Sequence, residues 1–315
     1  MWAYLSAGDE LALPEGIESP SVATSAGPLA GGRPWVLRTF LPEVSPRSMA
    51  IRFGGDVHAA FDAQNCRLAY AWQGDFVDLA ASWTHRGGRE ASLLGKVIWR
   101  SPPGFPWAIN LDQSPVAPDF AAQAADIALG GPVPPHDPQP NTRLHFLGYR
   151  LPPRGAESTV GPTMRYEVEL PGGQRAIFAE TISPLVTADA IGLLREVEIK
   201  APPGATALLN LAVDAKSRDL SSTPTEGAPA ASASPIPIMT LLDSEGPLVL
   251  SVRAAPGAAS WLAAAEQPGA VLALPCDPAD GVARLTLAIL RAKDASPEGI
   301  KRLVEQESSV RRESR

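Results

Sequence analysis

Short apolar runs recur along most of the chain, and turn sequences separate them. In RLAYAW at 67–72, Leu68, Tyr70 and Trp72 occupy every second position, the period of a strand with one buried face. We expect these three side chains to share one face and to point into the core. About 12 to 14 strands are expected, at 35–41, 49–53, 57–61, 67–72, 96–99, 143–151, 163–170, 174–182, 193–200, 207–214, 236–243, 247–254, 271–275 and 282–290.

Turn residues between the runs predict how the strands connect. Pro171-Gly172-Gly173 and Ala201-Pro202-Pro203-Gly204 each predict a hairpin, and Gln73-Gly74-Asp75 predicts a tight turn. Ser296 followed by Pro297 predicts a helix from 297 to about 312, with Ser296 as its N-cap. The sequence therefore predicts an all-β fold, a large antiparallel β-sandwich with a short C-terminal helix.

Composition divides the chain further. Residues 1–17 are expected to hold the end of a helix, and 18–33 are small, polar and Gly/Pro-rich as in a linker. The sandwich is expected over 34–295 and the helical end over 296–315.

Charge and hydropathy disfavour two classes of partner. The net charge of −7 gives no basic footprint for nucleic acid. No run of 18 apolar residues is present, so no membrane span is expected. The N-terminus also lacks the basic start and apolar run of a signal peptide.

Motifs for metal, haem or nucleophilic catalysis are missing from the sequence. The four histidines lie in separate segments, and no C-x-x-C, C-x-x-C-H or G-x-S-x-G occurs. We therefore expect no metal and no cofactor. Two cysteines, Cys66 and Cys276, could form one disulfide or remain as two buried thiols, and the sequence leaves both possibilities open.

Chemistry-bearing residues are densest just after the strand at 67–72. A carboxylate, an aromatic ring and a guanidinium together suit a sugar, whose C–H face stacks on a ring while its hydroxyls bond to polar groups. Arg38, Arg47 and Arg52 could equally pair with the acids of this segment. The candidate ligand-binding residues are Trp72, Asp75, Asp78, Trp83, His85 and Arg86.

Residues 33–88 also resemble a known but uncharacterised protein region. The phrases RTFLPEVSPRSMAI, FDAQNCRLAYAWQGDFVD and WTHRGG are similar to a β-rich region of multidomain c-type cytochrome proteins from planctomycete-like bacteria. The resemblance implies a periplasmic or cell-envelope location, a cytochrome domain or redox partner, and a remnant of the haem domain at 1–17. Because this chain lacks the haem motif, it would act as an accessory domain. The strand-rich layout is also similar to the galactose-mutarotase-like super-sandwich.

Three hypotheses follow. The first is an accessory module that binds a carbohydrate or a redox partner. The second is a mutarotase-like epimerase or lyase, with His85 or His145 as acid and Glu167 or Glu180 as base. The third is a spacer domain without a ligand, which would bury both Trp72 and Trp83.

Overall fold

A computed structural model describes residues 34–80, 89–112, 120, 143–153, 160–213, 218–220, 238–243, 246–254, 259–262, 269–294 and 296–313. In these ranges it contains seventeen strands, one 3₁₀ turn η1 (Pro171–Gly173) and one α-helix, α3 (Pro297–Glu313). The first nine strands are β1(Trp35–Arg38), β2(Ser48–Arg52), β3(Val57–Asp62), β4(Arg67–Asp78), β5(Ser92–Arg100), β6(Trp107–Asn110), β7(Arg143–Arg150), β8(Thr163–Glu169) and β9(Arg175–Val186). The others are β10(Ala190–Lys200), β11(Thr206–Val213), β12(Arg218–Leu220), β13(Ile238–Asp243), β14(Gly246–Ala254), β15(Ser260–Leu262), β16(Gly269–Pro275) and β17(Val282–Ala292).

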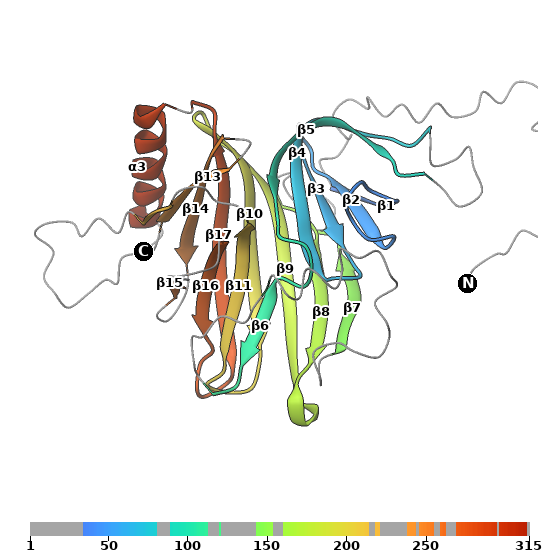
Figure 1. The fold of residues 1–315 in the computed structure, drawn as a ribbon, viewed down its shortest axis with the longest axis vertical. Helices are drawn as coiled ribbons and strands as arrows, with labels where there is room; N and C mark the ends of the chain where they lie inside the picture. The colour runs from blue at the N-terminus through green and yellow to red at the C-terminus, as the bar shows by residue number, and fades with distance from the viewer. Residues whose placement is uncertain are drawn as a thin grey trace, which may run out of the picture.

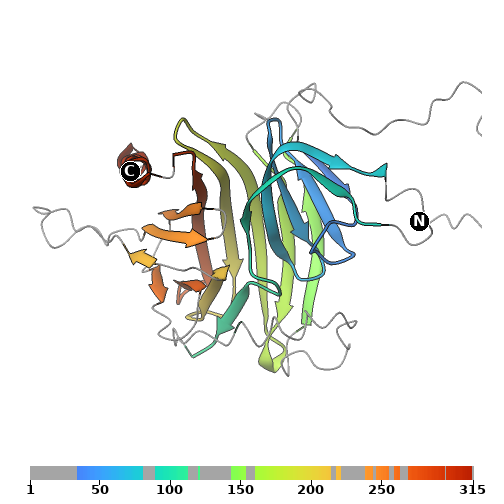
Figure 2. The same cartoon turned by 45° about the horizontal axis from the view of Figure 1, so that its top comes forward.

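The strands form three antiparallel sheets. Their orders are β1-β2-β3-β4-β5, β12-β13-β14-β17-β10-β9-β8-β7 and β15-β16-β11-β6. The eight-stranded sheet makes one layer, and the two smaller sheets lie beside each other over it (Figures 1 and 2). One apolar core draws buried side chains from all three sheets, including Phe61, Leu209 and Leu287. The predicted all-β sandwich is confirmed.

Each of the fourteen predicted runs contains a strand, but three short strands lie outside them. These are β6, β12 and β15, of three or four residues each. Such short segments carry too few residues to show a period of two. The hairpin at Pro171-Gly172-Gly173 is confirmed, since β8 and β9 pair antiparallel across it.

The predicted turn at Gln73-Gly74-Asp75 is wrong. β4 runs through this segment to Asp78 and accommodates it as a bulge against β5, between Gly74 and Val77. Gly74 takes a positive φ of 130°. A Cβ on the facing Gly95 would lie 2.3 Å from the carbonyl oxygen of Gln73, so the two strands touch backbone to backbone here.

A second bulge overturns the expected single face of β4. Ala60 pairs with Tyr70 and Phe61 pairs with Leu68, so Ala69 is an extra residue in β4. Leu68 consequently packs in the main core, whereas Tyr70 and Trp72 pack in a second core on the other face of the five-stranded sheet. Buried cores on both faces explain why every residue of β2 and β3 is buried.

The predicted hairpin at Ala201-Pro202-Pro203-Gly204 is also wrong. β10 already pairs with β9 on one side and β17 on the other, so it has no free edge for β11. β11 instead pairs with β16 and β6 in the facing sheet. The connection therefore crosses from one layer of the sandwich to the other, and both strands turn their apolar faces into the same core.

Helix α3 begins as the sequence predicts. The hydroxyl of Ser296 accepts a hydrogen bond from the Gly299 amide at 3.1 Å, which is an N-cap. The helix packs its Leu303 on the outer face of the eight-stranded sheet, against residues of β14 and β17. A two-bond ion pair from Arg253 to the buried Glu307 fastens it there, at 2.8 and 2.6 Å. Within the described ranges, no helix is both long and apolar enough to cross a membrane.

Candidate functional site

The structure describes three of the six predicted ligand-binding residues. Trp72 is completely buried, and its indole N–H donates to the carbonyls of Asp75 and Phe76, so it packs in the second core and offers no surface to a ligand. Asp75 is exposed, and Asp78 is half-buried and caps the Ala80 amide. The remaining predicted residues, Trp83, His85 and Arg86, lie outside the described residues.

Behind Asp75, the second core contains a buried histidine. His58 packs against the rings of Trp72 and Phe76, with ring centroids 5.3 and 5.2 Å away. Its Nε2 bonds to the carbonyl of Gly74 at 3.1 Å, while Nδ1 has no partner. Burial lowers the pKa of His58 to about 4, against a smaller opposing effect of the bond to Gly74. His58 is therefore neutral at pH 7, and we assign it a structural role.

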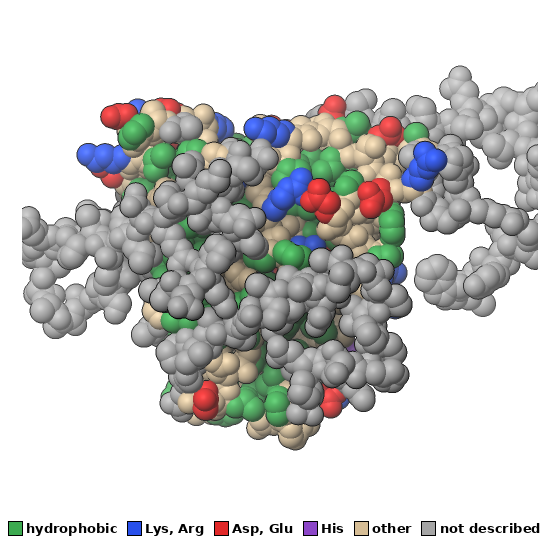
Figure 3. Space-filling model, in the orientation of Figure 1, with side chains coloured by type: hydrophobic (Ala, Val, Ile, Leu, Met, Phe, Trp, Pro, Cys, Tyr) green, Lys and Arg blue, Asp and Glu red, His purple; other side chains and the backbone are tan. Residues whose placement is uncertain are grey.

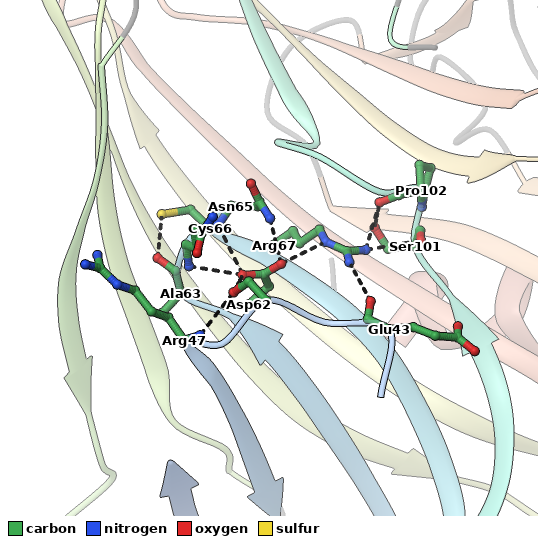
Figure 4. Close-up of polar contacts among 11 residues, drawn as sticks. Glu43, Arg47, Asp62, Ala63, Asn65, Cys66, Arg67, Ser101 and Pro102 are labelled. Carbon is green, nitrogen blue, oxygen red and sulfur yellow. Dashed lines mark hydrogen bonds and ion pairs between the residues drawn. The ribbon is translucent and has the colours of Figure 1, made fainter. Parts of the chain in front are cut away.

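Asp62 organises the corner between β3 and β4 (Figure 4). Its buried carboxylate accepts hydrogen bonds from Ser45, from the amides of Gln64 and Asn65, and from the Asn65 side chain. It also pairs with Arg67 at 3.4 Å.

Arg67 carries the same network across to neighbouring segments. Its guanidinium donates to the carbonyl of Glu43, between β1 and β2, and to those of Ser101 and Pro102, between β5 and β6, so a single side chain ties two connections to the Asp62 corner. Cys66, between the two charged residues, has a left-handed backbone with φ of 46°. Burial, first of all, and the charge of Asp62 raise the pKa of its thiol, so it is an unreactive buried group. Cys276 is likewise buried and unpaired.

A groove of about 240 Å³ lies beside this corner, where the five-stranded sheet meets the edge strand β7. Arg38, Arg47, Gln64 and His145 supply exposed polar side chains to it. Ala63, Leu144 and Phe146 complete the lining and are buried or half-buried. In Figure 4 the guanidinium of Arg47 extends away from Asp62. Because it gathers four polar side chains in one hollow, with only a small apolar surface between them, we take the groove as the candidate functional site.

No acid is among the described residues that line the groove, and three other acids pair with basic side chains outside it. Asp62 holds Arg67, Glu43 pairs with Arg100, and Glu167 pairs with Arg175 at 3.0 Å. Among the residues that the structure describes, the guanidinium groups of Arg38 and Arg47 have no ion pair or hydrogen bond. Their expected pairing with the acids of 75–78 is therefore not found in this part of the chain. On the face drawn in Figure 3, by contrast, positive and negative side chains are interspersed.

A second charged cluster lies inside the main core. Glu180 is fully buried and bonds to Arg195 at 2.7 Å and to the hydroxyl of Tyr166 at 3.0 Å. The Tyr166 hydroxyl in turn accepts from the indole of Trp107 at 3.0 Å. Desolvation, first of all, and the charge of Glu180 raise the pKa of Tyr166 far above its ordinary value. The cluster joins the eight-stranded sheet to β6 of the facing sheet and has no opening to solvent.

The acid and base of the enzyme hypothesis are partly brought together. His145 on β7 lies directly opposite Glu167 on β8, so the two share the outer face of the sheet. Glu180 is excluded as a base that contacts substrate, because it is buried. In the described ranges, no group of three or more His, Cys, Asp or Glu side chains could hold a metal ion.

Sequence reasoning missed the groove because its parts are far apart in the chain. Arg38 and His145 are separated by more than a hundred residues, and only the stacking of two sheets brings them together. The local signal was the F-D-A-Q-N-C-R phrase, whose Asp62 and Arg67 fix the corner that carries Ala63 and Gln64.

Comparison with known proteins adds one match. Residues 59–156 match a protein family described as "Domain of unknown function (DUF6797)". The matched range contains the Asp62 corner, the bulged β4 and His145, whereas Arg38 and Arg47 precede it. No curated protein matches the chain.

Proposed function

We propose that this chain is a non-catalytic binding module of the bacterial periplasm or cell envelope that recognises a carbohydrate beside a c-type cytochrome. The observation that supports binding most directly is the groove, which is lined by an amide, an imidazole and two guanidinium groups that have no ion pair among the described residues. A small number of polar groups that converge in one concave site can fix the orientation of a ligand. None of the described residues that line the groove is an acid, which favours binding over acid–base catalysis.

Titration of the chain against defined oligosaccharides tests this function. We expect saturable binding to a subset of neutral and acidic oligosaccharides in isothermal calorimetry. Asp75→Ala, near the end of β4, and Trp83→Ala test whether the segment 75–86 contributes, as the sequence predicts. Weaker binding in these variants supports a contact there, and unchanged binding removes that segment from the site. If no oligosaccharide binds, the spacer hypothesis, to which the burial of Trp72 conforms, replaces the proposal.

The cytochrome partner and the extracytoplasmic location are supported by the resemblance of residues 33–88 to a region of c-type cytochrome proteins. If the partner is a c-type cytochrome, we expect a C-x-x-C-H motif, the attachment site of c-type haem, to be encoded in the same or an adjacent gene. A genomic neighbourhood without any c-type cytochrome would remove the reason for both.

A mutarotase-like activity is the second candidate, favoured by the register that sets His145 opposite Glu167. If the pair were an acid and a base, the chain would accelerate the interconversion of aldose anomers, followed by polarimetry. His145→Gln and Glu167→Gln would then each abolish the acceleration. We expect no rate above the buffer rate, because Glu167 is held by Arg175.

A further inference from the structure

Arg38 and Arg47 stand out because both present to one small groove a positive charge that has no counter-charge among the described residues. Surface arginines commonly lie beside a carboxylate, as Arg100, Arg175 and Arg284 do in this chain. In the part of the chain that the structure describes, neither Arg38 nor Arg47 has such a partner. A planar guanidinium donates two parallel hydrogen bonds to an oxyanion, and two of them in one groove make an anion-binding arrangement.

The backbone that carries this groove is held in place before any ligand arrives. The carbonyl of Arg47 accepts the Ala63 amide at 3.2 Å, and the Ser48 amide donates to Ser45 at 3.0 Å. The Asp62 carboxylate accepts the Gln64 amide at 3.0 Å. Because these bonds fix both loops, binding would order few additional groups, which lowers the free-energy cost of association.

The size and the lining residues of the groove limit which ligands it can bind. Its volume of about 240 Å³ lies below the roughly 300 to 1,000 Å³ of pockets for drug-sized ligands, so it fits one small unit of a larger molecule. Phe146 and Leu144 offer an apolar surface, and Gln64 offers an amide that can donate to and accept from a hydroxyl. A sugar ring that carries an oxyanion would offer charged oxygens to the two arginines, hydroxyl groups to Gln64 and C–H groups to Phe146 and Leu144.

We propose that this groove is a subsite for an acidic sugar unit, in which Arg38 and Arg47 bind the carboxylate or sulfate oxygens. The proposal rests on the proposed carbohydrate-binding function and names its substrate class, an anionic glycan. Gln64 bonds to a ring hydroxyl, and the C–H face of the sugar contacts the exposed parts of Leu144 and Phe146. His145, whose cross-strand neighbour Glu167 is held by Arg175, lies at the margin on β7.

The test measures binding of the chain to a short oligogalacturonate, a sulfated oligosaccharide and a neutral oligosaccharide of equal length. Arg38→Gln and Arg47→Gln are each expected to weaken binding of an acidic oligosaccharide at least about tenfold, because hydrogen bonds to charged groups are among the stronger polar contacts. The carboxylate and sulfate arms show which oxyanion the groove prefers. Gln64→Ala is expected to weaken binding of the oligosaccharide without weakening that of free acetate.

Arg284→Gln is the matched control, since it removes the same charge from an exposed position on β17, far along the sheet order from β7. It should leave binding unchanged. The groove variants should unfold at the wild-type urea concentration, since both arginines are exposed and neither has an ion pair in the described part of the chain. A variant that unfolds earlier is replaced by the corresponding lysine variant, which keeps the charge but loses the paired geometry, and the same weakening is then expected.

Other outcomes separate the failure of this subsite from failure of the proposed function. Equal binding of neutral and acidic oligosaccharides, unaffected by either arginine variant, overturns the subsite and leaves carbohydrate binding intact. An equal loss in Arg284→Gln overturns it too, because the effect would then reflect net charge. Binding of an acidic peptide but of no oligosaccharide overturns both.

Discussion

Asp62 shows how strongly one buried side chain can determine a local structure. Its two oxygens receive five contacts, and the positively charged partner Arg67 is itself buried. Asp62→Asn keeps the size of the side chain but leaves Arg67 without a counter-charge. Breaking a buried ion pair from one side costs roughly 3 to 5 kcal/mol. We expect a loss of this order in the free energy of unfolding, measured by urea titration.

The exposed pair Glu43 and Arg100 provides the comparison for Asp62. Glu43→Gln also removes one carboxylate charge, but both partners lie in solvent. Exposed ion pairs contribute about 0 to 1 kcal/mol, so this variant should remain close to wild type. Similar losses in the two variants would show that the network of Asp62 does not depend on its charge.

The buried His58 is a second single residue with a testable effect, because it should make the free energy of unfolding depend on pH. Its pKa is about 4 in the folded chain and near 6.5 when unfolded, so between these values the unfolded state binds more protons. Stability is therefore complete above pH 6.5 and falls as the pH drops toward 4, by roughly 3 kcal/mol for this group at about 1.4 kcal/mol per pKa unit. Arg52, Asp56 and Asp75 are the charges that face it.

Urea unfolding between pH 4 and 7.5 tests the role of His58 against that of the exposed His145. His58→Gln keeps a side-chain N–H that can donate to Gly74 but cannot take up a proton. The stability of this variant should vary less with pH than that of wild type. His145→Gln should retain the wild-type slope. An identical slope in all three proteins would contradict the assignment, because other groups would then account for the acid sensitivity.

At the scale of elements, the cap of α3 can be tested separately from its packing. Ser296→Ala removes the acceptor of the Gly299 amide and should cost about 1 kcal/mol, whereas Ser296→Asp should retain the cap. Hydrogen exchange of the first-turn amides is the measurement, and protection should fall only in the alanine variant. Loss of protection in both variants would mean that the hydroxyl itself, and not a capping oxygen, is required.

At the scale of elements, the sequence predicts most strands but not every bulge and connection. Strands such as β8 and β9 were predictable because they alternate buried and exposed residues on either side of a Pro-Gly-Gly turn. The bulge at Ala69 was not, because an extra residue reverses the facing of all later positions without changing the composition. Ala201-Pro202-Pro203-Gly204 suits a hairpin and a crossing between layers equally well, and the choice depended on which edges of β10 were already paired.

At the scale of the whole molecule, the site was harder to predict than the fold. Strand formation depends on neighbours in sequence, whereas the groove depends on how β1 and its following loop lie against β7. From the sequence, Arg38 and Arg47 are possible ion-pair partners of the acids at 75–78. Which acids they approach is decided by tertiary distances, and no local pattern encodes those distances.

The buried chain from Arg195 through Glu180 and Tyr166 to Trp107 joins the two layers, so the sandwich should unfold as one unit. Glu180→Gln leaves the guanidinium of Arg195 without its charge partner in the core, at a cost of roughly 3 to 5 kcal/mol. Tyr166→Phe removes only the hydroxyl and should cost less, about 1 to 3 kcal/mol for the unpaired groups that remain. Because one core spans all three sheets, each loss of stability should apply to every sheet equally.

Hydrogen exchange in increasing urea measures whether the sheets unfold together. Peptides from β9 and β10 are followed beside peptides from β11 and β16. In Glu180→Gln both sets should open at the same lowered urea concentration; earlier opening of β11 and β16 alone would show that the four-stranded sheet unfolds independently.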